Sequence, residues 1–321
     1  MDIDEYLKEL DRIIAKLENK ELIEPDKDLL NKVEKNSEIL EKQIERVYED
    51  SLKELNDLIG LEEVKSEVNK LINYLLFVKK MNGKVKLGKI NLNMIFRGSP
   101  GTGKTTVARI VADILCGLGF LKSNKVLETT PRDFIGEYIG QTSIKAKKTI
   151  DKAHGGVIFI DEAYTFSDSN AESRNSFVPE AITEIIKEME KLETVFIFAG
   201  YSDKMDGFIN LNPGIKSRIA YDISFKDYTE EELIEMFNKK LKKSGLKMSD
   251  DAYESLLNKI NDYKSQKNNG NGRMINNLFS AIIREHATII KDETDQNKLL
   301  TITRESIDNI NIKRERGMSF G

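Results

Sequence analysis

Short apolar runs alternate with helical stretches in the middle of the chain, between about residues 60 and 225. Glycine, proline or polar residues bound each run, which is typical of strands buried in a sheet. The runs predict five strands, at residues 93–97, 125–129, 157–161, 195–199 and 221–225. Because strands that alternate with helices are usually joined by helical crossovers, the pattern predicts an α/β fold with a parallel sheet covered on both faces.

The N-terminal segment has a different pattern, with apolar residues at helical spacing and no glycine. One stripe of apolar residues precedes a break at residues 24–26, and a second runs from Leu30 to Val47. Residues 1–55 hold 17 acidic and 10 basic side chains, so we expect an acidic helical arm, either a hairpin or a short coiled coil. Two roles stay open for it: an arm packed on its own protein, or a module that binds a partner or guides oligomerisation.

Helical periodicity returns after residue 227 and continues to about residue 316. It predicts a small C-terminal helical domain and a loose tail. The chain is therefore expected to consist of the arm at 1–55, an α/β domain at 56–226, a helical domain at 227–316 and the tail at 317–321.

Composition narrows the class of protein. With 39% hydrophobic and 32% charged residues the chain can bury a core, and its net charge of -4 gives no electrostatic reason to coat nucleic acid or an anionic membrane. Cys116 is the only cysteine, which excludes an internal disulfide framework and a cysteine-based zinc site and favours a reducing compartment. The N-terminus does not have the pattern of a signal peptide, and no run of 18 uncharged apolar residues occurs, so we expect a cytoplasmic protein without a membrane segment.

The strongest chemical signal is a phosphate loop. Residues 98–105 read Gly-Ser-Pro-Gly-Thr-Gly-Lys-Thr, which matches G-x-x-x-x-G-K-[ST] and directly follows a predicted strand. In such a loop the backbone N–H groups surround phosphate oxygens, and the helix that begins near Lys104 directs its positive end at them. We expect Lys104 to neutralise the β- and γ-phosphates and Thr105 to offer its hydroxyl to Mg²⁺. The expected nucleotide contacts of this loop are Pro100, Gly101, Thr102, Gly103, Lys104, Thr105 and Thr106.

A second signal lies at the end of the third predicted strand, where Val157-Ile-Phe-Ile is followed by Asp161 and Glu162. In an open α/β sheet the ligand crevice lies at the carboxyl ends of the strands, so these carboxylates are expected to meet the phosphate loop there. Asp161 suits the Mg²⁺ shell because magnesium prefers oxygen ligands and keeps several waters. Glu162 suits polarisation of the attacking water.

Two arginines are candidates for the additional positive charge that phosphoryl transfer requires. Arg218 directly precedes the fifth predicted strand, and Arg273 opens a helix of the C-terminal domain. The sequence pattern alone does not separate these roles from those of ordinary surface salt-bridge residues.

Seven segments, in this order, resemble the AAA+ ATPases, and within them the group that contains stage V sporulation protein K and the red-type Rubisco activase. The resemblance covers roughly residues 50 to 316, and the segments are 60–65, 98–106, 136–142, 155–164, 199–201, 212–218 and 270–273. It implies a P-loop ATPase domain with a helical lid, bound ATP and Mg²⁺, and assembly as a ring, usually a hexamer.

The resemblance also assigns roles to single residues. It implies that Arg218 is an arginine finger that acts in trans, that Arg273 is the sensor of the lid, and that Leu61 lies where the family packs adenine. Ser202 is the nearest equivalent of the polar sensor at the end of the fourth strand. Residues Tyr138, Ile139 and Gly140 resemble the loop that projects into the central pore of the ring. In such a loop an aromatic and an aliphatic side chain grip an extended peptide, and glycine allows movement.

The leading hypothesis is therefore a ring-forming, Mg²⁺-dependent ATPase that threads or remodels a protein partner. Two alternatives stay open. The same fold also serves nucleotide-dependent DNA loaders and helicase-like motors, although the net charge and the apolar pore motif argue against nucleic acid as a partner. A slow ATP switch or scaffold, signalling through the N-terminal arm, is the other.

Overall fold

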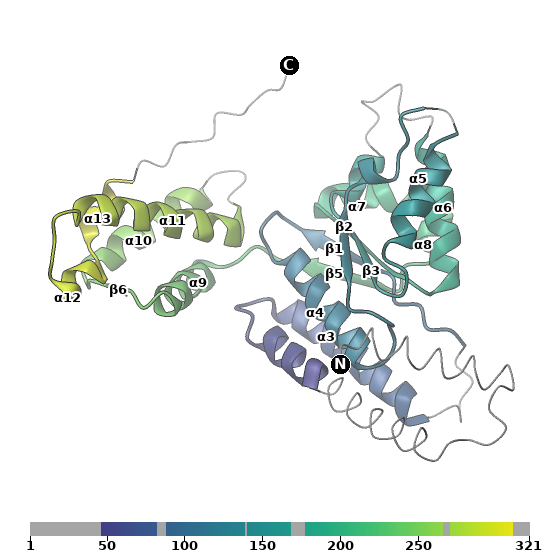
Figure 1. Cartoon of the computed structure of the whole chain (residues 1–321), viewed down its shortest axis with the longest axis horizontal. Helices are drawn as coiled ribbons and strands as arrows, with labels where there is room; N and C mark the ends of the chain where they lie inside the picture. The colour runs from purple at the N-terminus through teal and green to yellow at the C-terminus, as the bar shows by residue number, and fades with distance from the viewer. Residues whose placement is uncertain (1–45, 82–87, 139, 168–176, 266–269, 311–321) are drawn as a thin grey trace, which may run out of the picture.

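The computed structural model describes residues 46–81, 88–138, 140–167, 177–265 and 270–310. Most of the expected N-terminal arm, the expected tail at 317–321 and Ile139 lie outside these residues. Within them, the chain forms an α/β part followed by a smaller, mainly helical part, and the second lies at one end of the molecule (Figure 1).

A five-stranded parallel sheet forms the centre of the α/β part. Its strands are β1 (Met94–Gly98), β2 (Val126–Thr129), β3 (Val157–Ile160), β4 (Val195–Gly200) and β5 (Tyr221–Phe225). The order across the sheet is β2-β3-β4-β1-β5, so β1 lies between the fourth and fifth strands. All five predicted strands are confirmed, each within about one residue at either end.

The central strands are buried on both faces, which is why they appear in the sequence as continuous apolar runs. In β3, Val157 and Phe159 belong to one core cluster, whereas Ile158 and Ile160 belong to the cluster on the other face. β5 lies at the sheet edge, where it alternates between buried and more exposed residues.

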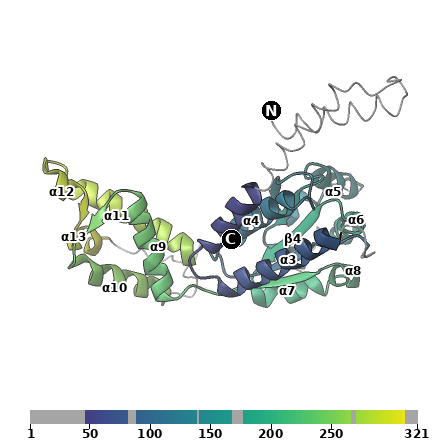
Figure 2. The same cartoon turned by 90° about the horizontal axis from the view of Figure 1, so that it is seen from below.

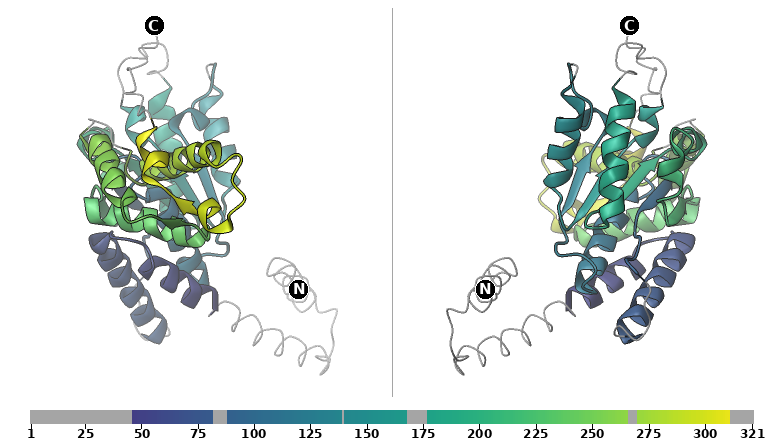
Figure 3. Two further views of the ribbon diagram at one scale, coloured as in Figure 1. Left: turned by 90° about the vertical axis from the view of Figure 1, so that its left-hand side faces the viewer. Right: turned by 90° about the vertical axis from the view of Figure 1, so that its right-hand side faces the viewer.

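Helices cover both faces of the sheet (Figure 3). α3 (Glu62–Met81) and α4 (Lys104–Gly117) supply the first core cluster, together with Leu55 from the helical residues 46–56. The second cluster holds residues of α5 (Thr142–Asp151), α6 (Val178–Lys191), α7 (Ser202–Ile209) and α8 (Pro213–Lys216). Two 3₁₀ turns, Pro131–Asp133 and Ala163–Phe166, follow β2 and β3.

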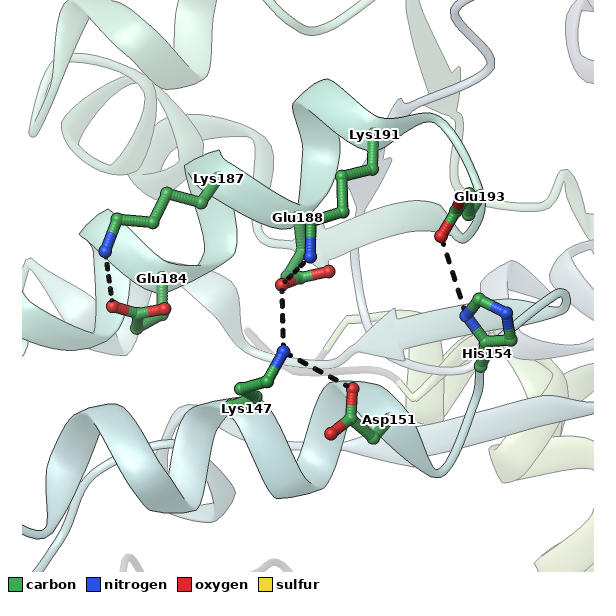
Figure 4. Close-up of polar contacts among 8 residues, drawn as sticks. All are labelled: Lys147, Asp151, His154, Glu184, Lys187, Glu188, Lys191 and Glu193. Atoms are coloured by element: carbon green, nitrogen blue, oxygen red, sulfur yellow. Dashed lines mark hydrogen bonds and ion pairs between the residues drawn. The ribbon is translucent and has the colours of Figure 1, made fainter.

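Charged side chains connect the outer surfaces of α5 and α6 (Figure 4). Lys147 on α5 lies 3.6 Å from Glu188 on α6, and Lys191 lies 2.6 Å from the same carboxylate. Next to them, His154 lies 3.9 Å from Glu193. Such surface pairs each contribute about 0–1 kcal/mol, so the buried cluster beneath them holds the two helices in place.

The C-terminal helical part packs around a third core cluster. Its helices are α9 (Glu230–Lys243), α10 (Ala252–Lys264), α11 (Asn271–Ile289), α12 (Gln296–Leu299) and α13 (Arg304–Asp308). The helical prediction is confirmed, but the structure adds a two-stranded parallel sheet of β6 (Lys247–Met248) and β7 (Thr301–Ile302). Below, this part is called the lid. Figure 2 shows α9 beside the α/β part. Among the residues described, no helix is both long and apolar enough to span a bilayer.

Candidate functional site

A cavity of about 650 Å³ lies where the α/β part meets the lid. Its walls come from the residues after β1, the carboxyl ends of β3 and β4, and the helices α9 and α11. β1 lies between β4 and β5, and its helical connection leads to the far edge of the sheet, so the strand order reverses here. Ligands of open α/β sheets bind at this position.

The phosphate loop forms one wall. It leaves β1 at Gly98 and enters α4 at Lys104, so the sequence motif lies between strand and helix as predicted. Gly101 has a φ of +76° and Gly103 a φ of +97°, and a Cβ at Gly101 would lie 2.1 Å from the Gly270 carbonyl oxygen. Glycine is therefore required at Gly101 both by backbone conformation and by close approach.

The start of α4 suits an anion. Its first turn holds no acidic residue, so no side chain of that turn neutralises the positive end of the helix. Of the residues predicted to contact nucleotide, Pro100, Gly101, Gly103, Lys104, Thr105 and Thr106 line the cavity. Thr102 does not, because it is fully buried and its hydroxyl donates to the Ser99 carbonyl oxygen at 2.8 Å.

Lys104 is held inside the loop. Its side-chain nitrogen donates to the carbonyl oxygens of Gly98 and Ser99 at 2.7 and 2.8 Å. Burial lowers the pKa of Lys104, Asp161 opposes that effect, and the positive charge of Arg273 adds to it. The amine can therefore exchange two carbonyl oxygens for phosphate oxygens without leaving the cavity.

Asp161 and Glu162 face the loop from the end of β3, and both line the cavity. The Asp161 carboxylate accepts a hydrogen bond from the Glu162 backbone N–H at 3.0 Å. Glu162 has a φ of 52°, a left-handed conformation that a glutamate seldom adopts, and its side chain is exposed. Strained backbone of this kind clusters at functional sites. Burial and then the charge of Glu162 raise the pKa of Tyr201, which also lines the cavity.

The donors needed for Mg²⁺ are present. Thr105 and Asp161 both line the cavity, and a hydroxyl and a carboxylate are hard oxygen donors that would suit magnesium, which takes few protein ligands because it keeps several waters. Within the described part of the chain, no three His, Cys, Asp or Glu side chains form a metal centre of another kind.

Arg273 lies in the first turn of α11 and lines the cavity from the lid side. Arg218 does not line the cavity of its own chain. Its guanidinium donates to the Gly214 carbonyl oxygen at 3.0 Å and to the Ser217 hydroxyl at 3.1 Å, and it pairs with Glu190 on α6. The Arg218 Nε is buried without a hydrogen-bond partner among the described residues.

Two other predicted residues lie beside the cavity without lining it. Leu61 packs against the first and third core clusters, whereas Ile59, which sequence reasoning did not select, lines the cavity. Ser202 begins α7, and its carbonyl oxygen accepts a hydrogen bond from Arg97 at 3.2 Å. Its neighbour Tyr201 faces the cavity instead.

The lid contributes further residues that sequence reasoning missed. Met236, Lys239, Lys240 and Lys243 line the cavity from one face of α9, at i, i+3, i+4 and i+7. This helical spacing is visible in the sequence, but it does not by itself indicate which face meets a ligand. Tyr228, at the link between β5 and α9, also lines the cavity.

The proposed pore residues lie on the loop that follows β2. Tyr138 is 67% exposed, and Gly140 has a φ of +80° with open space where a Cβ would lie. Ile139 lies outside the described residues, so its placement stays a prediction.

Comparison with known proteins gives a consistent result. The family model "ATPase family associated with various cellular activities (AAA)" matches residues 94–226, and the model "AAA lid domain" matches residues 229–317. A chloroplastic ribulose bisphosphate carboxylase/oxygenase activase from Cyanidioschyzon merolae is 40% identical over 247 residues, which cover 76% of this chain and 82% of the activase. Stage V sporulation protein K of Bacillus subtilis is 35% identical over 259 residues, covering 78% and 79%. Among solved structures, the AAA domain of FIGL-1 in complex with ADP has a TM-score of 0.53 at 16% identity, covering 78% of this chain and 81% of that one, which shows a shared fold.

Proposed function

Because the chain belongs to the AAA family of ATPases and therefore hydrolyses ATP, we propose that it is a Mg²⁺-dependent motor that assembles as a ring and remodels a protein partner. ATP hydrolysis follows from membership of the family. The assembly into a ring, the use of Mg²⁺ and the threading of a protein client are what we propose. The client would be a polypeptide, in keeping with relatives named as a Rubisco activase and as an ESX-1 secretion system protein.

In this proposal each wall of the cavity has one task. Lys104 and the N–H groups of the loop hold the phosphates, and Arg273 adds positive charge from the lid. Thr105 and Asp161 hold Mg²⁺, which would neutralise charge on the β- and γ-phosphates. Glu162 orients and polarises the attacking water from its exposed position after β3.

The position of Arg218 supports the proposal that the chain assembles as a ring. It lies at the carboxyl end of α8 and outside the cavity of its own chain, so it cannot serve the nucleotide bound there without a rearrangement. In a head-to-tail ring, each chain can offer such a residue to the site of its neighbour. The proposal assigns Arg218 this role.

The observation that carries the remodelling proposal is the exposure of Tyr138. Among the large hydrophobic side chains of the described residues, Tyr138 has the highest exposed fraction, 67%, and it lies two residues before Gly140, whose φ is +80°. Such a ring can contact an extended polypeptide through its face without reading the sequence.

The test separates hydrolysis from remodelling. Clients are first isolated on the Glu162→Gln variant with ATP, and their ATP-dependent unfolding is then followed with wild-type protein and with Tyr138→Ala. We expect Tyr138→Ala to retain basal ATP hydrolysis within about 2-fold and to lose client unfolding at least tenfold, because Tyr138 contacts no part of the nucleotide cavity. Tyr253→Ala is the matched control, since Tyr253 on α10 is a 45% exposed aromatic far from this loop in sequence.

Client unfolding by Tyr138→Ala at the wild-type rate would contradict the pore role. Stimulation of hydrolysis by single-stranded DNA, with none by isolated clients, would favour the DNA motor instead.

A further inference from the structure

Three neighbouring carbonyl groups of the phosphate loop accept hydrogen bonds from the lid of the same chain. The Asn271 side-chain amide donates to the Pro100 oxygen at 3.4 Å, and the Gly272 backbone N–H donates to the Gly101 oxygen at 3.0 Å. The Tyr228 hydroxyl donates to the Thr102 oxygen at 3.1 Å. The lid therefore contacts the backbone of the loop at three consecutive peptide groups.

These contacts determine where the loop directs its donors. In a planar trans peptide, the carbonyl of one residue and the N–H of the next point in opposite directions. When the lid holds the carbonyls of residues 100, 101 and 102 on its side, the N–H groups of Gly101, Thr102 and Gly103 point the other way. A phosphate loop uses backbone N–H groups of this kind for its ligand, and of the three residues Gly101 and Gly103 line the cavity.

The carbonyl groups of Gly98 and Ser99, which precede these three, accept hydrogen bonds from within the loop itself. Lys104 donates to Gly98 and Ser99, and the Thr102 hydroxyl also donates to Ser99. Every carbonyl from Gly98 to Thr102 thus has a donor. The last three donors of this series come from the lid.

Buried side chains hold the lid donors in place. Asn271 is 2% exposed and Tyr228 is 7% exposed. The Asn271 side chain accepts from the Tyr228 backbone N–H at 3.0 Å and donates to the Asp227 carboxylate at 3.0 Å. Asn271 has a φ of 47°, a conformation that asparagine tolerates better than most residues. Hydrogen bonds therefore connect the start of α11 to the link that leads into α9, and both segments contact the phosphate loop.

We infer that Tyr228 and Asn271 are positioning residues that keep the phosphate loop in its nucleotide-binding shape while the lid is docked. Movement of the lid away from the loop withdraws all three donors together, and the loop loses the contacts that orient its N–H groups. Nucleotide affinity then depends on lid position. By linkage, bound nucleotide favours the docked lid to the same extent.

The inference is tested by removing one donor at a time from the full-length chain. Tyr228→Phe keeps the ring and removes only the hydroxyl, and Asn271→Asp keeps the acceptor for Tyr228 but replaces the donor by an oxygen. Tyr263→Phe is the control, because it removes a phenolic hydroxyl from the lid at a residue that does not line the cavity. ADP dissociation constants, steady-state KM and kcat for ATP, and thermal unfolding without nucleotide are measured for each.

We expect Tyr228→Phe to raise the dissociation constant for ADP by about 3- to 10-fold, as the loss of one hydrogen bond predicts. KM for ATP should rise by a similar factor, and kcat should change less. Asn271→Asp should raise the ADP dissociation constant more than Tyr228→Phe does, because it places a carboxylate beside Asp227. Tyr263→Phe should behave as wild type. A purely structural role would lower thermal stability and leave the ADP affinity of the folded protein unchanged.

Wild-type ADP affinity in folded Tyr228→Phe would overturn the inference, and that variant decides the question even where Asn271→Asp does not fold. The outcome is independent of the ring and the client. A wild-type protein that binds ADP but does not remodel proteins would remove the proposed function and leave this inference standing.

Discussion

Glu162 combines two properties that seldom occur together, a left-handed backbone and an exposed carboxylate at the end of a buried strand. The residue directly follows β3 and lines the cavity. A glutamine has the same shape and can adopt the same angle, but it cannot accept a proton.

We therefore expect Glu162→Gln to bind ADP as the wild type does and to hydrolyse ATP at least about 100-fold more slowly, the range for loss of a general base. A coupled ATPase assay and an ADP titration measure the two quantities. Glu193→Gln is the control, because Glu193 pairs with His154 away from this cavity. Hydrolysis by Glu162→Gln near the wild-type rate would assign the water to another residue.

At the scale of elements, α9 begins with a complete capping box. The Thr229 hydroxyl accepts from the Glu232 backbone N–H at 3.2 Å, and the Glu232 carboxylate accepts from the Thr229 N–H at 2.7 Å. Tyr228 directly precedes this cap, so the cap fixes the angle at which the chain enters the lid.

We expect Thr229→Ala to lower the free energy of unfolding by about 1 kcal/mol, the usual cost of a lost N-cap. Urea denaturation followed by circular dichroism measures it. Thr288→Ala, in the last turn of α11, should cost no more than about 0.5 kcal/mol, because its exposed hydroxyl donates only to the Arg284 carbonyl oxygen of the same helix. Equal losses for the two variants would show that the cap adds nothing specific.

The sequence predicted well those elements that are long enough, and buried enough, to show a clear pattern of apolar residues. β3 is buried on both sides, so Val157 to Ile160 forms an unbroken apolar run. β6 and β7 have two residues each, too few for any period to appear, and they pair across more than fifty residues of chain.

The same contrast applies to the cavity. The phosphate loop and the two carboxylates are local motifs, and the structure places both on one cavity. Tyr228 and the lysines of α9 line the cavity only because the lid docks there, which no local pattern encodes. Ile59 lines it from the segment just before α3 and belongs to no recognisable motif. The sequence therefore predicted the residues of the α/β part that line the cavity, and their chemical roles stay predictions. Of the lid residues that line it, the sequence indicated Arg273 but not those of α9.

At the scale of the whole molecule, the cavity has positive charge from Lys104, Arg273 and the three lysines of α9, all of its own chain, while Arg218 does not line it and pairs with Glu190. The pairing of Arg218 with Glu190 keeps the guanidinium at the surface near β5, at a side-chain exposure of 28%. If the proposed ring forms, this surface faces the nucleotide of the next chain, and the active site becomes complete only between two chains.

Complementation between two inactive variants tests that arrangement. Arg218→Ala should bind ADP normally and hydrolyse ATP about 10³-fold more slowly, in the range for a lost arginine finger. In a mixed ring, each Arg218→Ala chain keeps Glu162 and each Glu162→Gln chain keeps Arg218. A site is complete wherever the first kind of chain receives Arg218 from a neighbour of the second kind. Random mixing in equal amounts should restore roughly a quarter of wild-type hydrolysis, because half of the sites are intact and half of their neighbours carry the arginine. An arginine that acts within its own chain gives no restoration, since every mixed site then lacks one of the two residues.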